Sequence, residues 1–289
     1  MRTVLVTGGN GQLGWELQRH APDSWSLRAL PHAALDITDA GQIAAALDGL
    51  RPDWVVNTAA YTAVDRAESE PRQAQAINVE GPARLAEACA ARGIALVHLS
   101  TDFVFDGRQS RPYRPDDPPN PLSVYGRTKL AGEQAVRERL GDDALIVRTS
   151  WAYSVHGHNF VKTMLRCLAE RPQVDVVCDQ VGTPTWAAGL ARALIRAIER
   201  DVRGIGHWTD NGVASWYDFA VAIRELALQL GLLREAAPVA PIATADYPTP
   251  ARRPAYSVLD KRDFQAALDL PGVHWRESLH SMMQELCHG

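Results

Sequence analysis

Short apolar runs alternate with longer segments of helical periodicity through the first half of the chain. Runs rich in β-branched residues predict buried strands at residues 3–7, 26–30, 54–57, 94–99 and 144–148. Apolar residues spaced three and four apart predict helices between them, at residues 12–20, 40–50, 73–91 and 125–140. This alternation is typical of α/β proteins with a doubly wound parallel (Rossmann-like) sheet. We therefore predict a dinucleotide-binding domain over residues 1–151.

The pattern is less regular in the second half. Helices are predicted at residues 160–170, 187–200, 215–230 and 275–286, and short strands at 174–178 and 204–208. Ser215 and Asp218 have the spacing of a capping box. A proline-rich connector spans residues 238–254. We interpret residues 152–289 mainly as a smaller, mixed α/β substrate-binding domain, some segments of which return to the first domain, and we expect the site in the crevice between the two.

Composition excludes several classes of protein. A formal charge of −4, without any basic cluster, argues against a nucleic-acid surface. The longest apolar runs are far shorter than a membrane span, and the N-terminal run is too short for a signal peptide. Four cysteines occur and none is paired as CxxC, so we expect reduced thiols and a cytoplasmic location. His156 and His158 lack further ligands at recognisable spacing, so we expect no metal site there.

A glycine-rich turn joins the first predicted strand to the first predicted helix. Gly8, Gly11 and Gly14 form the pattern G-x-x-G-x-x-G, a variant of the dinucleotide fingerprint. Glycines let the backbone turn tightly and approach a pyrophosphate, which then rests on the helix N-terminus. A tight turn without a ligand is the alternative, and the strand–turn–helix context disfavours it.

The choice between NADH and NADPH stays open. An acidic residue about 20 positions past the glycines often binds the ribose 2′-hydroxyl, but the second strand ends in Leu30-Pro31-His32. Asp36 follows slightly later, where it could bind the ribose or lie in the next loop near the adenine. Arg28 and His32 can tolerate a 2′-phosphate, which favours NADPH.

Tyr125 and Lys129 are four residues apart on a predicted helix, so they share one face. An ammonium group close to a phenol favours the phenolate, and we expect it to lower the pKa of Tyr125 toward the range of a general acid. Alone, such a pair is usually a packed aromatic ring and a solvated charge. Thr101 ends the fourth predicted strand, where ligands bind in open sheets, and its hydroxyl can donate to a carbonyl oxygen. By position alone, Thr101 is as readily a cap or turn residue.

Two further segments bear on the site. Residues 106–121 contain five prolines and run directly toward Tyr125, so we interpret them as a loop that forms one wall of the substrate site. Asn78 lies inside a predicted helix, where asparagine is unfavourable. It has either a buried hydrogen-bonding role or a place on a solvated face, and the sequence leaves both open.

Together these motifs resemble the extended short-chain dehydrogenase/reductase superfamily and, within it, the dTDP-4-dehydrorhamnose reductase family. The segments that carry the resemblance span almost the whole chain. They are residues 8–17, 100–107, 121–129, 148–151, 179–185 and 253–257. The superfamily set of Thr101, Tyr125 and Lys129 is moderately specific, and its combination with Asp179-Gln180 and Gly182-Thr183-Pro184-Thr185 is more so.

The resemblance implies a role for each matched residue. Tyr125 would be the proton donor, Lys129 would bind the nicotinamide ribose and tune Tyr125, and Thr101 would hold the sugar carbonyl. The implied cofactor-binding residues are Gly8, Asn10, Gly11, Gln12, Leu13, Gly14, Asp36, Ile37, Ala59, Ala60, Tyr61, Tyr125 and Lys129. The implied substrate-binding residues are Thr101, Asp102, Trp151, Gln180, Thr185 and Arg253.

The implied reaction is reduction of the C4 ketone of dTDP-4-dehydro-L-rhamnose by NADPH or NADH, the last step of dTDP-L-rhamnose synthesis. The resemblance also implies a homodimer and a possible magnesium ion at the subunit interface. Glu16 matches a family position linked to that ion, although a solvated helix residue is the interpretation we favour. Two alternatives remain, an epimerase or dehydratase of the same superfamily and a non-catalytic dinucleotide-binding subunit. The latter would have little reason to keep Thr101, Tyr125 and Lys129 together.

Overall fold

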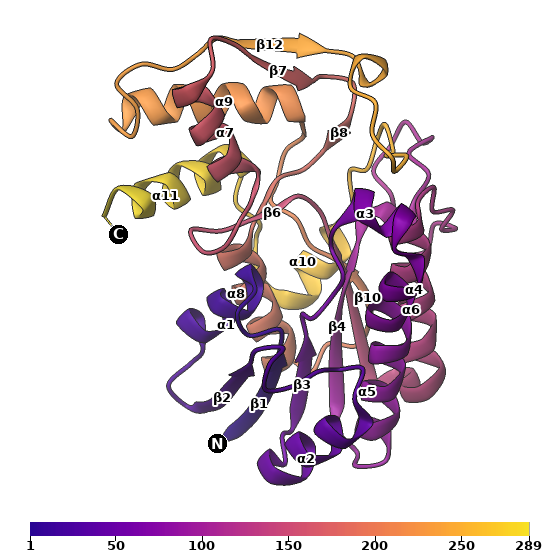
Figure 1. The fold of residues 1–289 in the computed structure, drawn as a ribbon. Helices are drawn as coiled ribbons and strands as arrows, with labels where there is room; N and C mark the ends of the chain where they lie inside the picture. Colours follow the sequence, from indigo (N-terminus) through magenta and orange to yellow (C-terminus); the bar gives the residue numbers. More distant parts are fainter. Residues whose placement is uncertain (289) are drawn as a thin grey trace.

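Six parallel strands form one sheet in the order β10-β5-β4-β3-β1-β2 (Figure 1). Their bounds are β1 (Arg2–Thr7), β2 (Trp25–Leu30), β3 (Trp54–Asn57), β4 (Ala95–Thr101), β5 (Ala144–Thr149) and β10 (Gly204–His207). The computed structural model describes residues 1–288. Because all pairs are parallel, the carboxyl ends of the strands meet at one edge of the sheet. The order reverses at β1, which places the switch point between β1 and β3 at that edge.

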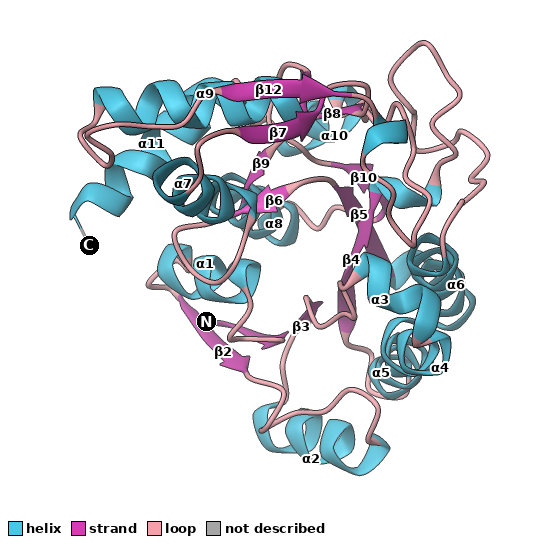
Figure 2. Ribbon diagram, turned by 45° about the horizontal axis from the view of Figure 1, so that its top comes forward, coloured by secondary structure: helices cyan, strands magenta, loops and turns pink. Residues whose placement is uncertain are grey.

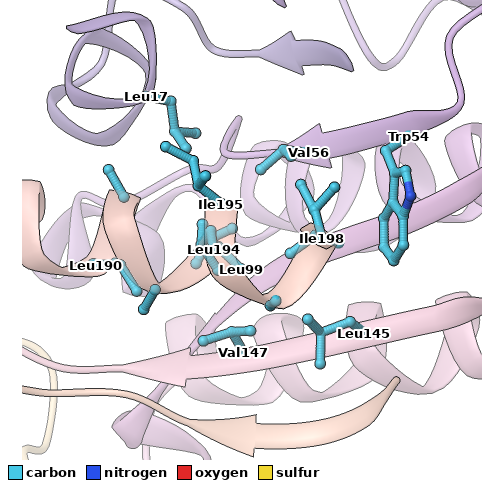
Figure 3. Close-up of a cluster of buried hydrophobic side chains, with 14 of the residues drawn as sticks. Leu17, Trp54, Val56, Leu99, Leu145, Val147, Leu190, Leu194, Ile195 and Ile198 are labelled. Carbon is cyan, nitrogen blue, oxygen red and sulfur yellow. The ribbon is translucent and has the colours of Figure 1, made fainter. Parts of the chain in front are cut away.

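Helices cover both faces of the sheet (Figure 2). One face carries α1 (Gln12–His20), α8 (Ala187–Glu199) and α10 (Arg262–Leu268), and the other α2 (Ala40–Leu50), α5 (Gly81–Ala90) and α6 (Val124–Leu140). Alternation along β1 explains the two layers, since Val4 and Val6 pack toward α8 while Leu5 packs on the opposite side. Figure 3 shows the α8 layer, where Leu194 and Ile198 meet the sheet. Burying each such side chain contributes about 1.5–3 kcal/mol.

The second half also builds a separate core above the sheet. It contains α7 (Phe160–Glu170), α9 (Trp216–Gln229) and α11 (Trp275–His288), with the paired strands β7 (Val174–Val177) and β12 (Val239–Ile242). Two shorter pairs complete it: β6 (Ala152–Tyr153) with β9 (Thr185–Trp186), and β8 (Val181–Gly182) with β11 (Ala214–Ser215). The division into domains at residue 151 stays a prediction.

The predicted doubly wound sheet is confirmed, and so is the capping box, since the Ser215 hydroxyl accepts from the N–H of Asp218 and the carboxylate of Asp218 accepts from the N–H of Ser215. The predicted single helix over residues 73–91 is wrong in one respect. It consists of α4 (Pro71–Gln75), a π-helical segment (Ala76–Glu80) and α5. Pro82 has no N–H to continue the regular hydrogen-bond ladder, which accounts for the wide turn before it.

Several short elements were not predicted from the sequence, among them the two-residue strands β6, β8, β9 and β11 and three longer elements. The longer three are α3 (Val64–Ser69), α10 and β12, the last of which lies inside the predicted connector. Pro241 is tolerated in β12 because this strand pairs with β7 alone. All four cysteines carry free thiols. No helix within residues 1–288 combines the length and the apolarity needed to cross a bilayer.

Asp210 follows β10 and is buried, with its carboxylate accepting the N–H of Trp186 at 3.1 Å. Burial raises the pKa of Asp210 to about 7, partly offset by the Trp186 and Ser278 hydrogen bonds and by the charges of Lys261 and Arg192. The folded state therefore binds a proton that the unfolded chain releases near pH 4. Stability from this group is present below about pH 4 and is lost as pH rises through about 7.

We expect Asp210→Asn to change the pH dependence of stability. The variant and the parent should be similarly stable at pH 4, and the variant should gain up to roughly 4 kcal/mol relative to the parent by pH 8. Urea denaturation of both proteins across this range measures the difference. A difference in the free energy of unfolding that stays constant with pH would contradict the assignment.

Candidate active site

The glycine turn leaves the N-terminus of α1 open. Gly11 is the N-cap of α1 and no side chain caps the helix, so its first N–H groups are free to bind an anion. Gly8 has φ +68°, and a Cβ there would lie 2.9 Å from the Thr58 hydroxyl of the β3 exit. A Cβ at Gly14 would lie 2.6 Å from the Gly8 carbonyl oxygen. The exits of β1 and β3 therefore approach each other as a dinucleotide site requires.

Gly11 differs from its neighbours because it is exposed and a Cβ there would meet only the Gly8 carbonyl oxygen, at 3.2 Å. We expect Gly11→Ala to keep the melting temperature but weaken NADPH binding at least tenfold, about 1.4 kcal/mol, because the methyl group occupies the approach of the pyrophosphate. Fluorescence titration with NADPH, beside thermal denaturation, measures both. Gly14→Ala is the contrasting variant and should lose stability as well. Unchanged affinity in Gly11→Ala would contradict this placement of the cofactor.

Hydrogen bonds to the Asn78 side chain hold the loop that follows β3. The N–H of Tyr61 donates to Asn78 Oδ1 at 2.8 Å, and Asn78 Nδ2 donates to the Tyr61 carbonyl at 3.1 Å. Asn78 Nδ2 also donates to Thr128 Oγ1 at 3.2 Å, on the helix that carries Tyr125. Of the two roles that the sequence left open, the structure shows the buried hydrogen-bonding one. Ala59 and Ala60 are half-buried in the same loop.

The segment after β2 borders the glycine turn, since the N–H of Gly9 donates to the Leu30 carbonyl at 2.9 Å. Asp36 is half-buried, and the N–H and hydroxyl of Thr38 both donate to its carboxylate at 2.8 Å. These bonds lower the pKa of Asp36. Ile37 is buried beside Gly81, while His32 is exposed with its Nδ1 4.0 Å from Asp36.

Tyr125 and Lys129 lie in the first turns of α6. Ser123 caps this helix by accepting the N–H of Gly126 at 3.1 Å. The Tyr125 ring packs edge-on to Phe103, with centroids 5.6 Å apart. Lys129 is buried, and its Nζ donates to the Leu99 carbonyl of β4 at 2.6 Å. The pair therefore lies against the carboxyl end of β4.

Burial raises the pKa of Tyr125 to about 12; the Thr101 hydroxyl opposes this shift and the Asp102 charge adds to it. The expected lowering by Lys129 is therefore wrong for the protein alone. Lys129 donates to a backbone carbonyl instead, and its own pKa is lowered to about 8 by burial, against the charge of Glu133. Tyr125 is consequently a neutral phenol at physiological pH, which is the form that can donate a proton.

Thr101 and Asp102 complete the cluster at the end of β4. The Thr101 hydroxyl accepts the N–H of Phe103 at 3.2 Å, so it does cap a 3₁₀ turn (Asp102–Val104), and it donates to Asp102 Oδ1 at 3.0 Å. Burial raises the pKa of Asp102 to about 6, opposed by the hydroxyls of Ser257 and Thr101. Asp102 Oδ2 has no hydrogen-bond partner within residues 1–288. The Thr101 hydroxyl, the Tyr125 phenol and the Asp102 carboxyl group thus lie together at the end of β4.

A buried ion pair behind this cluster was missed from the sequence. Arg148 Nε and Nη2 donate to the two carboxylate oxygens of Glu133 at 2.9 and 2.7 Å, and both side chains are only 3% exposed. The Ser100 hydroxyl also donates to Glu133, and Arg148 Nη1 donates to the Pro115 carbonyl of the proline-rich loop at 3.2 Å. A charged residue at the end of a strand predicted to be buried was the available signal.

The predicted substrate residues lie in different settings. Trp151 has φ +47° and its ring stacks on Trp216, with centroids 3.7 Å apart. It is two residues beyond Thr149, which pairs with Thr101 in the sheet. Thr185 is fully buried, while Gln180 Nε2 donates to the Thr244 hydroxyl at 3.1 Å. The structure thus brings Trp151 to the edge that carries Thr101, and the substrate roles of Gln180, Thr185 and Arg253 stay predictions.

Glu16 does not provide a magnesium site in the single chain. Its carboxylate is fully buried, accepts from the Ser154 hydroxyl at 2.7 Å and lies 3.5 Å from both Arg19 and His20. Within residues 1–288, no three acidic, histidine or cysteine side chains are grouped to hold a metal ion. The predicted solvated helix residue is also wrong, because Glu16 packs against the loop after β6.

Comparison with known proteins gives consistent results. The family model described as the RmlD substrate binding domain matches residues 1–288. A "dTDP-4-dehydrorhamnose reductase" of Streptomyces griseus is 45% identical over 98% of this chain and 93% of its own length. One of Aggregatibacter actinomycetemcomitans is 40% identical over 98% of both chains. The crystal structure of the Bacillus anthracis dTDP-4-dehydrorhamnose reductase "in complex with NADP" is 36% identical, covers 99% of this chain and 100% of that one, and superposes with a TM-score of 0.93.

Proposed function

The chain belongs to the RmlD substrate binding domain family, and we propose from this that it reduces the C4 ketone of dTDP-4-dehydro-L-rhamnose to dTDP-L-rhamnose. The observation that carries the proposal is the neutral Tyr125 phenol close to Thr101, with Lys129 one turn further along the same helix, at the sheet edge where the glycine turn opens. This arrangement supplies a proton donor, a second donor toward a carbonyl oxygen and a dinucleotide site in one place.

A nicotinamide cofactor fits the residues present. The free N–H groups at the start of α1 would bind its pyrophosphate, and Lys129 its nicotinamide ribose. The NADP in the Bacillus anthracis relative supports this cofactor class. We propose a preference for NADPH, supported by the exposed Arg28 of β2 and by the exposed His32, which lies near Asp36. When bound, the cofactor supplies the hydride that arrives at C4 of the sugar.

The chain's own residues then handle the proton. As hydride reaches C4, negative charge develops on the ketone oxygen, and the Tyr125 O–H donates its proton to that oxygen to give the alcohol. The Thr101 hydroxyl turns from Asp102 toward the same oxygen and stabilises the charge. Tyr125 is left as the phenolate and regains its proton from solvent. The charge of Lys129, once its ammonium faces the ribose, stabilises that phenolate.

The remaining substrate residues would hold the rest of the nucleotide-sugar. Trp151 presents an aromatic ring to the sugar, and Arg253 presents a planar guanidinium to the diphosphate. Gln180 and Thr185 would contribute to the nucleotide side. We further propose a homodimer in the cytoplasm, supported by the family resemblance and the free thiols, which sedimentation and cell fractionation would test.

The proposed reaction is tested by absorbance at the nicotinamide band with enzymatically prepared dTDP-4-dehydro-L-rhamnose. We expect the absorbance to fall with NADPH, more slowly with NADH, and dTDP-L-rhamnose to accumulate. Cofactor that copurifies stoichiometrically, with no net consumption, would instead identify an epimerase or dehydratase. A folded protein that binds dinucleotide but never turns over would identify a non-catalytic subunit.

A further inference from the structure

The short helix α3 contacts two segments that carry proposed site residues, in each case through a carboxylate. Glu68 Oε1 accepts the N–H of Val124, the first residue of α6, at 2.8 Å. Asp65 accepts both from the Arg253 side chain and from the Ala251 N–H, the latter at 3.2 Å. In Figure 1, α3 accordingly lies beside the late connector and above α6. A single six-residue helix therefore touches the helix that carries Tyr125 and the segment that carries Arg253.

Within residues 1–288, the hydrogen bonds of Arg253 leave one edge of its guanidinium free. Nη1 and Nη2 donate to the two carboxylate oxygens of Asp65 at 3.1 and 2.7 Å. The second Nη1 proton is shared by the Thr249 hydroxyl at 2.5 Å and the Ala251 carbonyl at 3.2 Å. A guanidinium has five N–H groups, so Nε–H and the second Nη2–H remain. They point the same way, which is the fork that binds two phosphate oxygens.

Arg253 is close in the sequence to a residue that contacts the reacting groups. Arg253 precedes Ser257 by four residues, and the Ser257 hydroxyl acts on the Asp102 carboxylate. Four extended residues span at most about 13–14 Å. The intervening backbone is fixed, because Val181 bonds to both Ala255 and Ser257. A sugar held at Thr101 can therefore place its diphosphate near Arg253.

The ion pair has little value for stability by itself. Asp65 and Arg253 are partly exposed, at 38% and 23%, and exposed ion pairs contribute little to stability. The geometry nevertheless uses both carboxylate oxygens and a second set of acceptors to fix one guanidinium orientation. Such fixing reduces the conformational entropy that Arg253 would lose on binding an anion.

We propose that Asp65 is a positioning residue that orients Arg253, so that its free Nε–Nη2 edge binds the diphosphate of the nucleotide-sugar. The inference rests on the proposed function, because that function supplies the diphosphate. Through Glu68, the same helix ties this binding edge to the start of the helix that carries Tyr125.

The test is Asp65→Asn in the full-length chain, which removes the charge and keeps the size. We expect KM for dTDP-4-dehydro-L-rhamnose and Kd for dTDP to rise about tenfold, with kcat within about twofold and NADPH affinity unchanged. Asp48→Asn is the matched control, since it breaks another exposed aspartate–arginine pair, with Arg92, on the far side of the sheet. A merely structural role would lower the melting temperature and leave the dTDP affinity unchanged, and that result would overturn the proposal.

A double-variant cycle shows whether Asp65 affects dTDP affinity through Arg253. If Asp65 acts through Arg253, then Asp65→Asn should add little to the loss of dTDP affinity in Arg253→Lys. Fully additive losses would overturn the proposal. Should the parent protein fail to reduce the ketone, the proposed reaction falls, while dTDP titration still tests Asp65. A parent that binds neither dTDP nor inorganic pyrophosphate would overturn both.

Discussion

Replacing Tyr125 by phenylalanine is expected to lower kcat for ketone reduction by roughly 10²–10⁴-fold. The variant loses only the phenol oxygen, while the ring contact with Phe103 remains. Burial keeps the pKa of Tyr125 at about 12, so the parent side chain carries its proton under all ordinary assay conditions. Without that proton, the developing alkoxide retains only the Thr101 hydroxyl as a nearby donor from this cluster.

Steady-state kinetics and NADPH titration of the same variant separate chemistry from binding. NADPH affinity should change by less than about threefold, because the variant keeps the ring of residue 125, Lys129 and the N-terminus of α1, which make up most of the proposed cofactor site. Tyr247→Phe is the control, since Tyr247 is 58% exposed and belongs to none of the proposed machinery. Equal turnover of Tyr125→Phe and the parent would remove Tyr125 from the mechanism.

Replacing Arg148 by methionine is expected to destabilise the protein by about 3–5 kcal/mol. The change leaves the Glu133 carboxylate buried at 3% exposure, and within residues 1–288 the Ser100 hydroxyl is then its one remaining side-chain hydrogen-bond partner. It also frees the Pro115 carbonyl, which ties the proline-rich loop to β5. Urea denaturation of the variant beside the parent measures the loss.

The double variant Glu133→Leu with Arg148→Met tests whether the unpaired Glu133 carboxylate causes this loss of stability. Replacing both members of a buried pair by apolar residues of similar size is often neutral or stabilising. We expect the double variant to recover at least half of the stability that Arg148→Met loses. Losses that add in the double variant would show that the destabilisation comes from packing or from the proline-rich loop rather than from an unpaired carboxylate.

The parts of the fold that the sequence encodes locally were predictable. Short apolar runs rich in β-branched residues, such as Val4–Val6, predict strands, and the strand–glycine–helix order predicts the turn, because both depend on neighbouring residues. Tyr125 and Lys129 meet Thr101 because a parallel sheet brings strand ends to one edge. The candidate site could therefore be proposed before the fold was known.

Contacts between distant segments were not predictable in the same way. Asp65 and Arg253 are 188 residues apart, and α3 is too short to show helical periodicity. The raised pKa of Tyr125 also escaped, because a four-residue spacing reports proximity to Lys129 but not burial or the competing Leu99 carbonyl. Asn78 gave a usable signal through its unfavourable place in a helix, although its partners lie on other elements.

The most direct test of the proposed hydride transfer follows a deuterium label from NADPH to the sugar. The protein is incubated with dTDP-4-dehydro-L-rhamnose and NADPH that carries deuterium at the transferable nicotinamide position, and the product is examined by mass spectrometry and NMR. If NADPH transfers hydride to C4, we expect dTDP-L-rhamnose with one deuterium at C4 and an equal amount of NADP⁺. A product that lacks the label, or a sugar that is converted without net oxidation of NADPH, would contradict it.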